Sequence, residues 1–568
     1  MPAPAFLGPL ALIFAAALGV AFLLHRLHQP PLIGFLLAGA LLGPFGLGLV
    51  HDVHAIESLA ELGVVILLFT VGLELSLGSL RRLGKIVWLA GPIQLFGTIA
   101  LVFAVGLAAG YPRPRALFFG YLVALSSTAI VLKLLVDRRE LDSPHGRFLI
   151  GILIFQDLAV VPMLLSLEFL SGGRGAGAGL LVTALGKTAV TAAALWLTAR
   201  VLIPRFIGAL AGTRQKEIFV VAVLCLVLAS ALATSWAGLS AALGAFLAGL
   251  VLSESEYGHQ AMADVAPFRD AFNALFFVSI GMLFDPRVLV ARPVLVAVLL
   301  GLILFGKSLA GAVPVLALGY GFRAAMVVGM SLAQIGEFSF VLLRQGLAVE
   351  LISPALYQLF LAAAIITMVA TPFLSEASHA VAGRVARTGA RRRLESDEAP
   401  SEAGVVVIGF GHMGETVARV LKRAEVPFRV IDLDPDRVRR GAKRGVPVEY
   451  GDSTNDVVLR RAGVASARAV IVLLSDLRST RQTIRLCRGL APATFLLART
   501  RYLADIPALS AAGADEVVAE EFESSLEIAG RALRKLGFPI PWVESETDEI
   551  RRTRHEGFRR FREPGGGS

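Results

Sequence analysis

The chain has 568 residues, of which 55% are hydrophobic and only 17% are charged, and its mean hydropathy is +0.71. This composition excludes an ordinary soluble enzyme and indicates an integral membrane protein. Its two cysteines exclude a disulfide framework and a cysteine-rich metal site. The formal charge of +10 is concentrated in short loops, in a linker and in the tail. We therefore attribute it to membrane topology, and we expect no nucleic-acid partner.

Apolar runs bounded by charges, glycine or proline predict thirteen membrane spans within residues 1–380. They lie near residues 5–25, 31–49, 57–75, 85–109, 116–136, 147–170, 178–203, 216–234, 238–253, 266–284, 293–317, 324–344 and 354–378. Basic residues are more frequent in the loops on the side that carries the C-terminal half. This bias predicts a cytoplasmic C-terminal half and an N-terminus outside the membrane.

The sixth predicted span carries an amide beside an acid, Gln156 and Asp157. Asp157 lies about ten residues into this span, or roughly 15 Å at the rise of an α-helix, which is near the middle of a bilayer. The alternative is an acid near a helix end that reaches the headgroups. A carboxylate in hydrocarbon is costly, so we expect Asp157 to face the protein interior and to be functional.

Three more spans carry polar residues at a similar depth. Ser127 and Thr128 lie in the fifth span, Lys307 in the eleventh and Glu337 in the twelfth. Spans five and twelve hold corresponding places in the two halves, and paired interrupted spans are typical of inverted-repeat transporters with a site near the midplane. The alternatives are packing by small hydroxyl residues in span five and a structural hydrogen bond at Glu337.

These groups predict a site for a cation and a proton. Hard oxygen ligands replace the water of a cation, and Asp157, the Gln156 side-chain oxygen and the hydroxyls of Ser127 and Thr128 provide them. A single acid holds either a proton or a cation, and this competition is the physical basis of antiport. One acid predicts one-for-one exchange. We expect no catalysis and no metal other than the transported ion.

The soluble half begins after a charged linker at residues 381–403. Its basic first part is expected to lie along the anionic lipids of the inner leaflet. A separate acidic loop near residues 253–264 carries Glu254 and Glu256, which are either solvated charges or a contact for the basic cytoplasmic domain. Residues 523–564 are predicted to form a C-terminal helix and basic tail, and residues 565–568 are interpreted as a cloning remnant.

The pattern of residues 404–522 predicts a nucleotide-binding fold. A β-branched run at 405–408 leads into a glycine-rich turn and a helix, and a second strand at 428–431 ends at an acid. The candidate nucleotide-binding residues are Gly409, Gly411, His412, Met413, Gly414, Asp432, Asp452 and Ser453. Further strands are predicted near 448–450, 469–474, 494–498 and 516–519. Strand, glycine turn, helix, strand and acid in this order indicate a phosphate at the helix N-terminus and a ribose on the acid. The alternative is a fold that has lost its ligand.

Several motifs together resemble those of the Kef-type potassium efflux antiporters of the second monovalent cation:proton antiporter family, which carry a C-terminal RCK (KTN, TrkA-N) domain. They are SSTAIVLKLL at 126–135, FQDLAVVPMLL at 155–165, SEYGHQAMADVAPFRDAFNALFFVSIGM at 255–282, GEFSFVL at 336–342, GFGHMGE at 409–415, VIDLDPDRV at 430–438 and YGDST at 450–454. The resemblance covers nearly the whole chain. It implies an α-helical sodium/proton-antiporter-like membrane domain with crossing discontinuous helices, followed by a Rossmann-like RCK domain.

The resemblance also implies a function and partners. Gln156 and Asp157 match the pair that accompanies potassium in this family, and Lys307 matches the lysine beside the site. A homodimer in a bacterial inner membrane is implied, with an adenine nucleotide (AMP, ATP or NAD(H)) in each RCK domain. Some members are gated by glutathione and carry an ancillary cytoplasmic reductase. Arg499 and Arg501 match paired arginines of that regulatory region, whereas Ser479–Arg481 replaces an asparagine of the pattern.

Three other functions remain as alternatives. The first is a sodium/proton antiporter of the same fold. The second is an RCK-gated potassium channel. The sequence argues against a channel because it lacks a short filter loop of the TVGYG type. The third is a membrane-anchored oxidoreductase, for which we find no substrate domain. The leading hypothesis is a potassium/proton antiporter gated by its cytoplasmic domain.

Overall fold

The computed structural model describes residues 7–26, 29–50, 53–74, 84, 86–171, 215–236, 241–255, 257–391 and 404–559. These residues divide into two compact units, and each is described by itself. The first comprises Met1–Leu134, Phe148–Pro314 and Met326–Ser378, and the second comprises Leu135–Arg147, Val315–Ala325 and His379–Ser568. The predicted span at 178–203 and Glu256 lie outside the described residues.

The first unit consists of apolar helices. Among the described residues, six helical stretches are long and apolar enough to cross a membrane: Ile86–Ala108, Arg113–Asp137, Pro144–Leu167, Lys216–Trp236, Pro293–Ala317 and Pro354–His379. Six shorter apolar helices accompany them, at Gly8–Leu24, Pro31–Leu42, Glu61–Leu73, Leu243–Ser253, Phe322–Ser331 and Phe338–Ala348. The predicted number of thirteen spans is therefore not confirmed. The prediction of a membrane domain built from many helices is confirmed.

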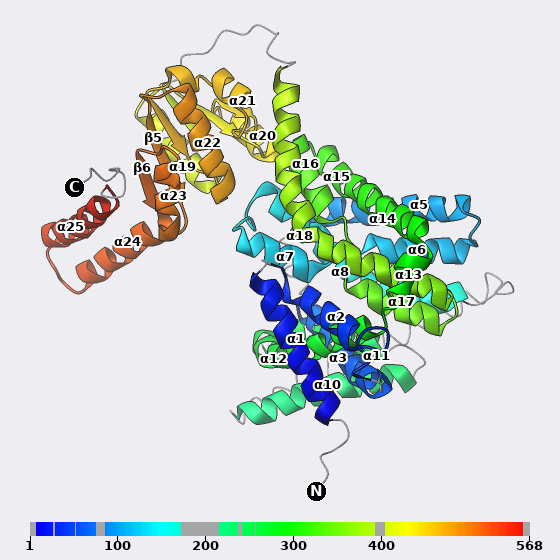
Figure 1. The fold of residues 1–568 in the computed structure, drawn as a ribbon. Coiled ribbons are helices and arrows are strands. Elements are labelled where there is room, and N and C mark those ends of the chain that lie inside the picture. The colour runs from blue at the N-terminus through cyan, green and yellow to red at the C-terminus, as the bar shows by residue number, and fades with distance from the viewer. Residues whose placement is uncertain are drawn as a thin grey trace, which may run out of the picture. The chain divides into compact units, whose positions relative to one another are not determined.

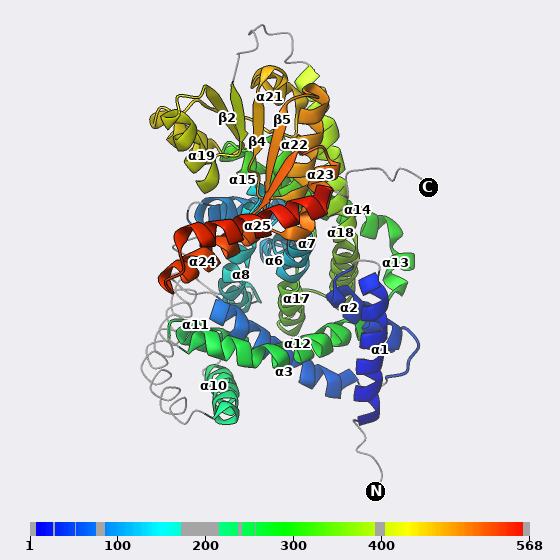
Figure 2. The ribbon, with the colours of Figure 1, turned by 90° about the vertical axis from the view of Figure 1, so that its left-hand side faces the viewer.

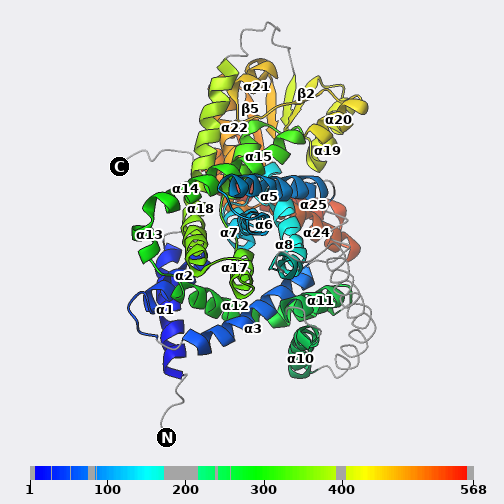
Figure 3. The ribbon, with the colours of Figure 1, turned by 90° about the vertical axis from the view of Figure 1, so that its right-hand side faces the viewer.

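One group of helices in this unit packs through small residues. Its members are α1 (Leu7–Arg26), α2 (Pro31–Leu42), α3 (Val53–Glu74), α10 (Lys216–Trp236), α11 (Ala241–Ser253) and α12 (Gly258–Met282), as Figures 1 and 3 show. A Cβ atom at Gly39 would lie 2.0 Å from the Val278 carbonyl oxygen, and one at Gly281 would lie 2.1 Å from that of Leu36. Helices α2 and α12 therefore approach to backbone contact, as small residues allow in membranes.

A second group surrounds two broken helices. It contains α5 (Gly91–Ala108) after the π-helical turn η1 (Ile86–Ala90), α6 (Arg113–Ala124), α7 (Thr128–Asp137), α8 (Pro144–Ser171), α16 (Phe322–Ser331), α17 (Phe338–Ala348) and α18 (Pro354–Arg391). The short α13 (Arg287–Ala291) precedes α14 (Pro293–Gly301), which continues through the π-helical turn η2 (Leu302–Gly306) into α15 (Lys307–Ala317). Buried aromatic rings fill the interior, and the rings of Phe119 and Phe360 lie 5.1 Å apart.

The second unit contains a six-stranded parallel sheet of order β3-β2-β1-β4-β5-β6, part of which is visible in Figure 2. The strands are β1 (Val405–Ile408), β2 (Phe428–Asp432), β3 (Val448–Tyr450), β4 (Ala469–Val472), β5 (Phe495–Thr500) and β6 (Glu516–Ala519). The connecting helices are α19 (His412–Arg423), α20 (Pro435–Lys443), α21 (Asp456–Arg461), α22 (Leu477–Leu490) and α23 (Ile506–Ala511), with 3₁₀ turns at Val464–Ser466 and Leu503–Asp505. The predicted Rossmann-like fold is confirmed, and its order reverses at β1, where such folds bind ligands.

Capping residues explain where the helices of this sheet begin. Asp434 precedes α20 and accepts hydrogen bonds from the backbone of Asp436 and Arg437, while Pro435 supplies the fixed φ angle of a first helical residue. Two helices follow the sheet, α24 (Glu520–Lys535) and α25 (Ile540–Arg559). The Arg551 guanidinium lies 2.8 Å from the Glu523 carboxylate and joins them. The predicted C-terminal segment from residue 523 thus begins inside α24.

Candidate functional site

Two broken helices cross and hydrogen-bond to each other in the first unit. Helix α6 ends at Ala124 and α7 begins at Thr128, while α16 ends at Ser331 and α17 begins at Phe338. The backbone N–H of Gly336 donates to the Leu125 carbonyl oxygen at 3.0 Å. The Ser126 hydroxyl donates to the Leu332 carbonyl oxygen at 3.1 Å. The crossing therefore satisfies backbone groups that neither broken helix can satisfy alone.

Lys307 fastens both breaks. Its side chain is 1% exposed, and its ammonium donates to the backbone carbonyl oxygens of Leu125 and Gln334, one from each broken helix. A buried ammonium is costly unless its protons are bonded. Carbonyl oxygens left free by the two breaks provide these acceptors. Lys307 thus joins the crossing that the sequence predicted it to lie beside.

Asp157 lies at the start of α7. The Thr128 hydroxyl, on the first residue of that helix, is 3.1 Å from each carboxylate oxygen of Asp157. The Asp157 side chain comes from α8 and is 8% exposed. A carboxylate near a helix N-terminus is stabilised by the partial positive charge there. The structure thus brings Asp157 and Thr128 together.

A second carboxylate reaches the same helix end. Glu337, which precedes α17, accepts a hydrogen bond from the Ala129 backbone N–H at 3.3 Å through Oε1. Its Oε2 atom is buried and has no partner among the described residues, and neither does the side-chain amide of Gln334. Two acids therefore contact consecutive residues, Thr128 and Ala129. The sequence named both acids, but it did not indicate that they share one helix end.

The Gln156 amide is occupied by the crossing. Its Oε1 atom accepts from the Ser126 backbone N–H at 2.7 Å, and its Nε2 atom donates to Gln94 Oε1, also at 2.7 Å. Gln94 in turn donates to the Thr98 hydroxyl at 3.1 Å. The oxygen predicted to bind an ion thus holds the break between α6 and α7. Sequence reasoning missed Gln94, whose only signal is a polar residue in an apolar span.

Replacement of Gln156 by leucine is expected to destabilise the protein. The change leaves the buried Ser126 N–H without its acceptor, which costs about 1–3 kcal/mol. We expect a lower thermal unfolding midpoint for the purified protein in detergent, and a smaller loss in a Thr98→Val variant. An unchanged midpoint in Gln156→Leu would contradict the structural role of this amide.

The glycine-rich turn between β1 and α19 has the geometry of a phosphate-binding loop. Gly409 has φ of +105°, a conformation that favours glycine, and a Cβ at Gly414 would lie 2.0 Å from the Gly409 carbonyl oxygen. At Gly411, by contrast, a Cβ would meet only the Arg437 guanidinium, at 3.5 Å. No side chain caps this end of α19, which begins with the exposed His412 and the half-buried Met413. The protein alone would accommodate a Cβ at Gly411. This glycine therefore keeps space open at the start of α19, where a phosphate would bind.

Asp432 closes this loop at the end of β2. Its carboxylate accepts hydrogen bonds from the backbone N–H groups of Phe410 and Asp434. The Arg437 guanidinium lies 3.6 Å from Asp432 and beside Gly411, so it adds positive charge next to the phosphate-binding turn. Sequence reasoning missed Arg437. Each carboxylate oxygen keeps a further lone pair, so Asp432 is able to accept a ribose hydroxyl.

Asp452 and Ser453 follow β3, and both are engaged within the protein. Asp452 accepts hydrogen bonds from the Thr454 backbone and hydroxyl at 2.9 and 2.6 Å, and the Arg323 guanidinium lies 3.7 Å away. The Ser453 hydroxyl contacts that of Thr483 at 3.2 Å. These contacts define a polar turn beside the sheet.

Two glycine substitutions separate ligand binding from folding. Gly411→Ala is expected to fold normally and to lose the thermal stabilisation that AMP, ATP or NADH gives the full-length protein. Gly414→Ala is expected to destabilise the protein without any ligand, because its methyl group overlaps the Gly409 carbonyl oxygen. Thermal unfolding of both variants with each nucleotide measures the difference. A Gly411→Ala protein with the full nucleotide response would contradict the assignment of this loop.

The predicted regulatory residues lie in two places. Glu254 is exposed in the turn after α11. Arg499 donates to the Leu474 carbonyl oxygen at 3.2 Å and pairs with Glu520, and Arg501 lies 3.7 Å from the Asp142 carboxylate. Arg499 and Arg501 line a pocket at the carboxyl ends of β4 and β5, together with Asp476, Thr500, Tyr502 and other residues of the second unit.

Both halves of the chain match known families. Residues 12–376 match the model described as sodium/hydrogen exchanger, transmembrane, and residues 405–520 match the TrkA-N domain. The chain therefore belongs to the sodium/hydrogen exchanger family and carries a TrkA-N domain. Its membrane part shares the fold of the sodium proton antiporter MjNhaP1 from Methanocaldococcus jannaschii, with a TM-score of 0.51 and 16% identity over 66% of this chain and 97% of that one.

The curated relatives are named as antiporters. The putative cation/proton antiporter YbaL of Escherichia coli is 34% identical over 91% of this chain and 96% of its own length. The putative K(+) efflux antiporter KefB of Alkalimonas amylolytica is 34% identical over 95% and 83%. The chloroplastic K(+) efflux antiporter 1 of Arabidopsis thaliana is 36% identical over 92% of this chain, which spans about half of that longer protein. These relatives confirm the resemblance to Kef-type antiporters.

Proposed function

We propose that this protein is a cation/proton antiporter that exchanges potassium for protons at the crossing of its broken helices. The observation that carries this proposal is the placement of the buried Asp157 carboxylate on the Thr128 hydroxyl at the start of α7. A buried acid beside broken helices is costly to keep and is characteristic of an ion pathway. The names of the relatives support the same activity.

Competition for Asp157 couples the two ions. An ionised carboxylate binds a cation together with hydroxyl and carbonyl oxygens, and a protonated carboxylate does not. Lys307 is held by the Leu125 and Gln334 carbonyl oxygens, so its role is to stabilise the crossing rather than to neutralise Asp157 permanently. Glu337 accepts a hydrogen bond from the Ala129 backbone N–H at the same helix end. The exchange of one cation for one proton follows from a single exchanging acid.

Potassium is the proposed ion, and sodium is the alternative. The relatives named K(+) efflux antiporters support potassium, whereas the MjNhaP1 likeness supports the fold alone.

The test of ion selectivity uses purified protein in liposomes that contain a pH-sensitive dye and hold an imposed proton gradient. Potassium and sodium chloride are added in turn. We expect potassium to dissipate the gradient more strongly, and an equal or larger response to sodium would replace potassium by sodium in the proposal.

We further propose that the TrkA-N domain binds an adenine nucleotide and regulates exchange. The open phosphate loop at Gly411, with Asp432 and Arg437 beside it, supports binding. Helix α18 supports coupling, because one continuous helix runs from the apolar stretch Pro354–His379 to Arg391, where the predicted linker lies.

Further proposals come from the family resemblance. They are glutathione at Arg499 and Arg501, a contact from Glu254 and Glu256, an ancillary reductase and a homodimer. A bacterial inner membrane and an external N-terminus are proposed as well.

A further inference from the structure

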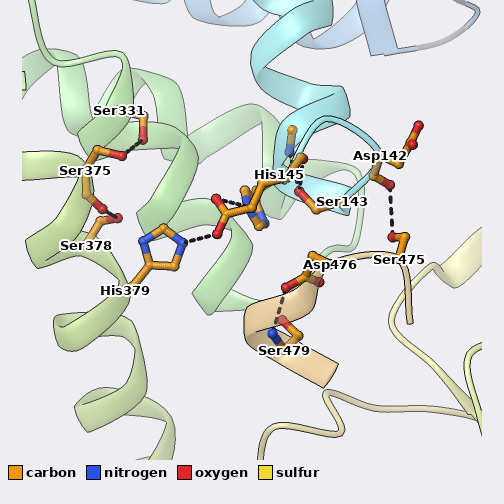
Figure 4. Close-up of polar contacts among 12 residues, drawn as sticks. Asp142, Ser143, His145, Ser331, Ser375, Ser378, His379, Ser475, Asp476 and Ser479 are labelled. Atoms are coloured by element: carbon orange, nitrogen blue, oxygen red, sulfur yellow. Dashed lines mark hydrogen bonds and ion pairs between the residues drawn. The ribbon is translucent and has the colours of Figure 1, made fainter. Parts of the chain in front are cut away.

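Three potential metal ligands converge away from the ion site. Glu140 lies in the turn between α7 and α8, His145 lies in the first turn of α8, and His379 lies on α18. All three belong to the second unit. A His145 ring nitrogen is 3.1 Å from Glu140 Oε2, and a His379 ring nitrogen is 3.5 Å from Glu140 Oε1 (Figure 4). Sequence reasoning missed this group because His379 is far from the other two in the chain.

The local backbone builds this arrangement. Arg139 adopts φ of +56° and turns the chain after α7, and the Ser143 hydroxyl donates to the Glu140 carbonyl oxygen at 2.6 Å. A Cβ at Gly146 would lie 2.1 Å from that same carbonyl oxygen, so the turn is pressed against the start of α8. This close approach places the Glu140 side chain beside His145. Glu140 is 2% exposed and His379 is 9% exposed.

The spacing of the three groups fits a small divalent ion. Zinc binds imidazole nitrogen and carboxylate oxygen at about 2.0–2.2 Å, which separates neighbouring ligand atoms by roughly 3.3 Å in a tetrahedron. His145 lies 3.1 Å from one Glu140 oxygen and His379 lies 3.5 Å from the other, close to that distance, and one ligand atom from each of the three residues lies within 4.8 Å of the others. Two imidazoles and one carboxylate suit zinc and similar transition metals better than calcium or magnesium.

We propose that Glu140, His145 and His379 bind one divalent transition-metal ion of the zinc type. The His145 side chain is the most exposed of the three, at 13%, and leaves an opening through which water would reach a fourth coordination position. A set of three protein ligands with one open position differs from the closed four-ligand sites of structural zinc.

Binding at this site links two helices that matter for exchange. His145 begins the helix that carries Asp157, and His379 lies on the helix that leads toward the TrkA-N domain. A metal ion bridging them opposes any motion that separates these helix ends. We therefore expect the metal to slow exchange by at least about fivefold, the lower end of typical coupling between sites. This consequence rests on the proposed antiport, whereas the binding itself does not.

The test measures binding without transport. Full-length protein in detergent is stripped with a chelator and titrated with Co²⁺, which absorbs visible light strongly when four-coordinate, and bound zinc is counted by equilibrium dialysis. We expect one ion per chain in the wild type and at least about a hundredfold weaker binding in His145→Ala and His379→Ala. Glu140→Gln keeps the size of the side chain and is the variant to use if the histidine variants unfold. His555 lies in α25, and His555→Ala is the control, which is expected to keep full binding.

Each outcome decides the proposal. Absence of the Co²⁺ band in folded wild-type protein, or equal binding in all three site variants, would show that the histidines form only ion pairs with Glu140. Binding that is lost in the variants supports the site, whatever the transport assay gives. If zinc binds as expected and liposomes show no cation/proton exchange, the site stands and the proposed antiport fails. If zinc binds and exchange is unaffected, only the coupling between them fails.

Discussion

Asp157→Asn is expected to reduce cation/proton exchange to the level of protein-free liposomes while the protein remains folded. Asparagine keeps the size of the side chain and an oxygen acceptor for the Thr128 hydroxyl, so the start of α7 is preserved. It carries no charge and does not exchange a proton, and both properties are required at the site. The measurement is dissipation of an imposed pH gradient by potassium in proteoliposomes, with the thermal midpoint recorded in parallel.

A matched control separates this effect from the loss of any buried acid. Asp264 is 6% exposed, accepts from Gln260 at 2.7 Å and lies 3.2 Å from the Lys216 ammonium. It belongs to the other helix group, so Asp264→Asn is expected to keep exchange even if it lowers stability. Wild-type exchange by Asp157→Asn would contradict the site assignment. Equal loss in both variants would attribute the effect to folding.

Gly336→Ala is expected to disrupt the crossing itself. A Cβ at this position would lie 2.5 Å from both the carbonyl carbon and the carbonyl oxygen of Ser126, and because the nearest atoms all belong to the backbone, no flexible side chain can move aside. Overpacking of this kind costs about 1–3 kcal/mol or more. It also separates Gly336 from Leu125, to which its N–H donates. We expect a lower thermal midpoint in detergent and a loss of exchange that exceeds the loss of folded protein.

Gly97→Ala is the corresponding control. Gly97 lies within α5, and a Cβ there would meet nothing within 4 Å. Alanine in a helix interior is favoured over glycine by roughly 0.5–1 kcal/mol, so this variant is expected to be as stable as the wild type or slightly more stable. Similar thermal midpoints for Gly97→Ala and Gly336→Ala would contradict the tight crossing.

The fold was predictable where local patterns determine it. β-branched runs and the glycine turn placed strands at 405–408, 448–450 and 516–519, and the structure has strands with these bounds. Polar and small residues predicted the breaks near Ser127 and Glu337. The predicted number of membrane spans is not confirmed in the described residues, where helices such as α2 and α11 are shorter than a bilayer is thick. The apolar runs alone did not distinguish crossing helices from shorter ones.

The contacts within the site were not predictable, because they depend on residues far apart in sequence. Gln156 and Asp157 are neighbours in α8, yet Gln156 bonds to Ser126 and Gln94 while Asp157 contacts Thr128. Which of the two side chains reaches Ser126 and which reaches Thr128 depends on the rotation of α8. Periodicity does not give that rotation for a helix that is apolar on all sides.

In the proposed antiport, cation movement and proton movement are obligatorily coupled at the crossing of the broken helices. The test imposes potassium and proton gradients in the same direction across proteoliposomes, so that they drive the exchanger in opposite senses, and finds the ratio at which neither ion moves. One-for-one exchange predicts balance when potassium is about tenfold more concentrated on the side that is one pH unit more acidic, regardless of membrane voltage. Potassium flux that follows the voltage and ignores the pH gradient would identify a channel and exclude an antiporter.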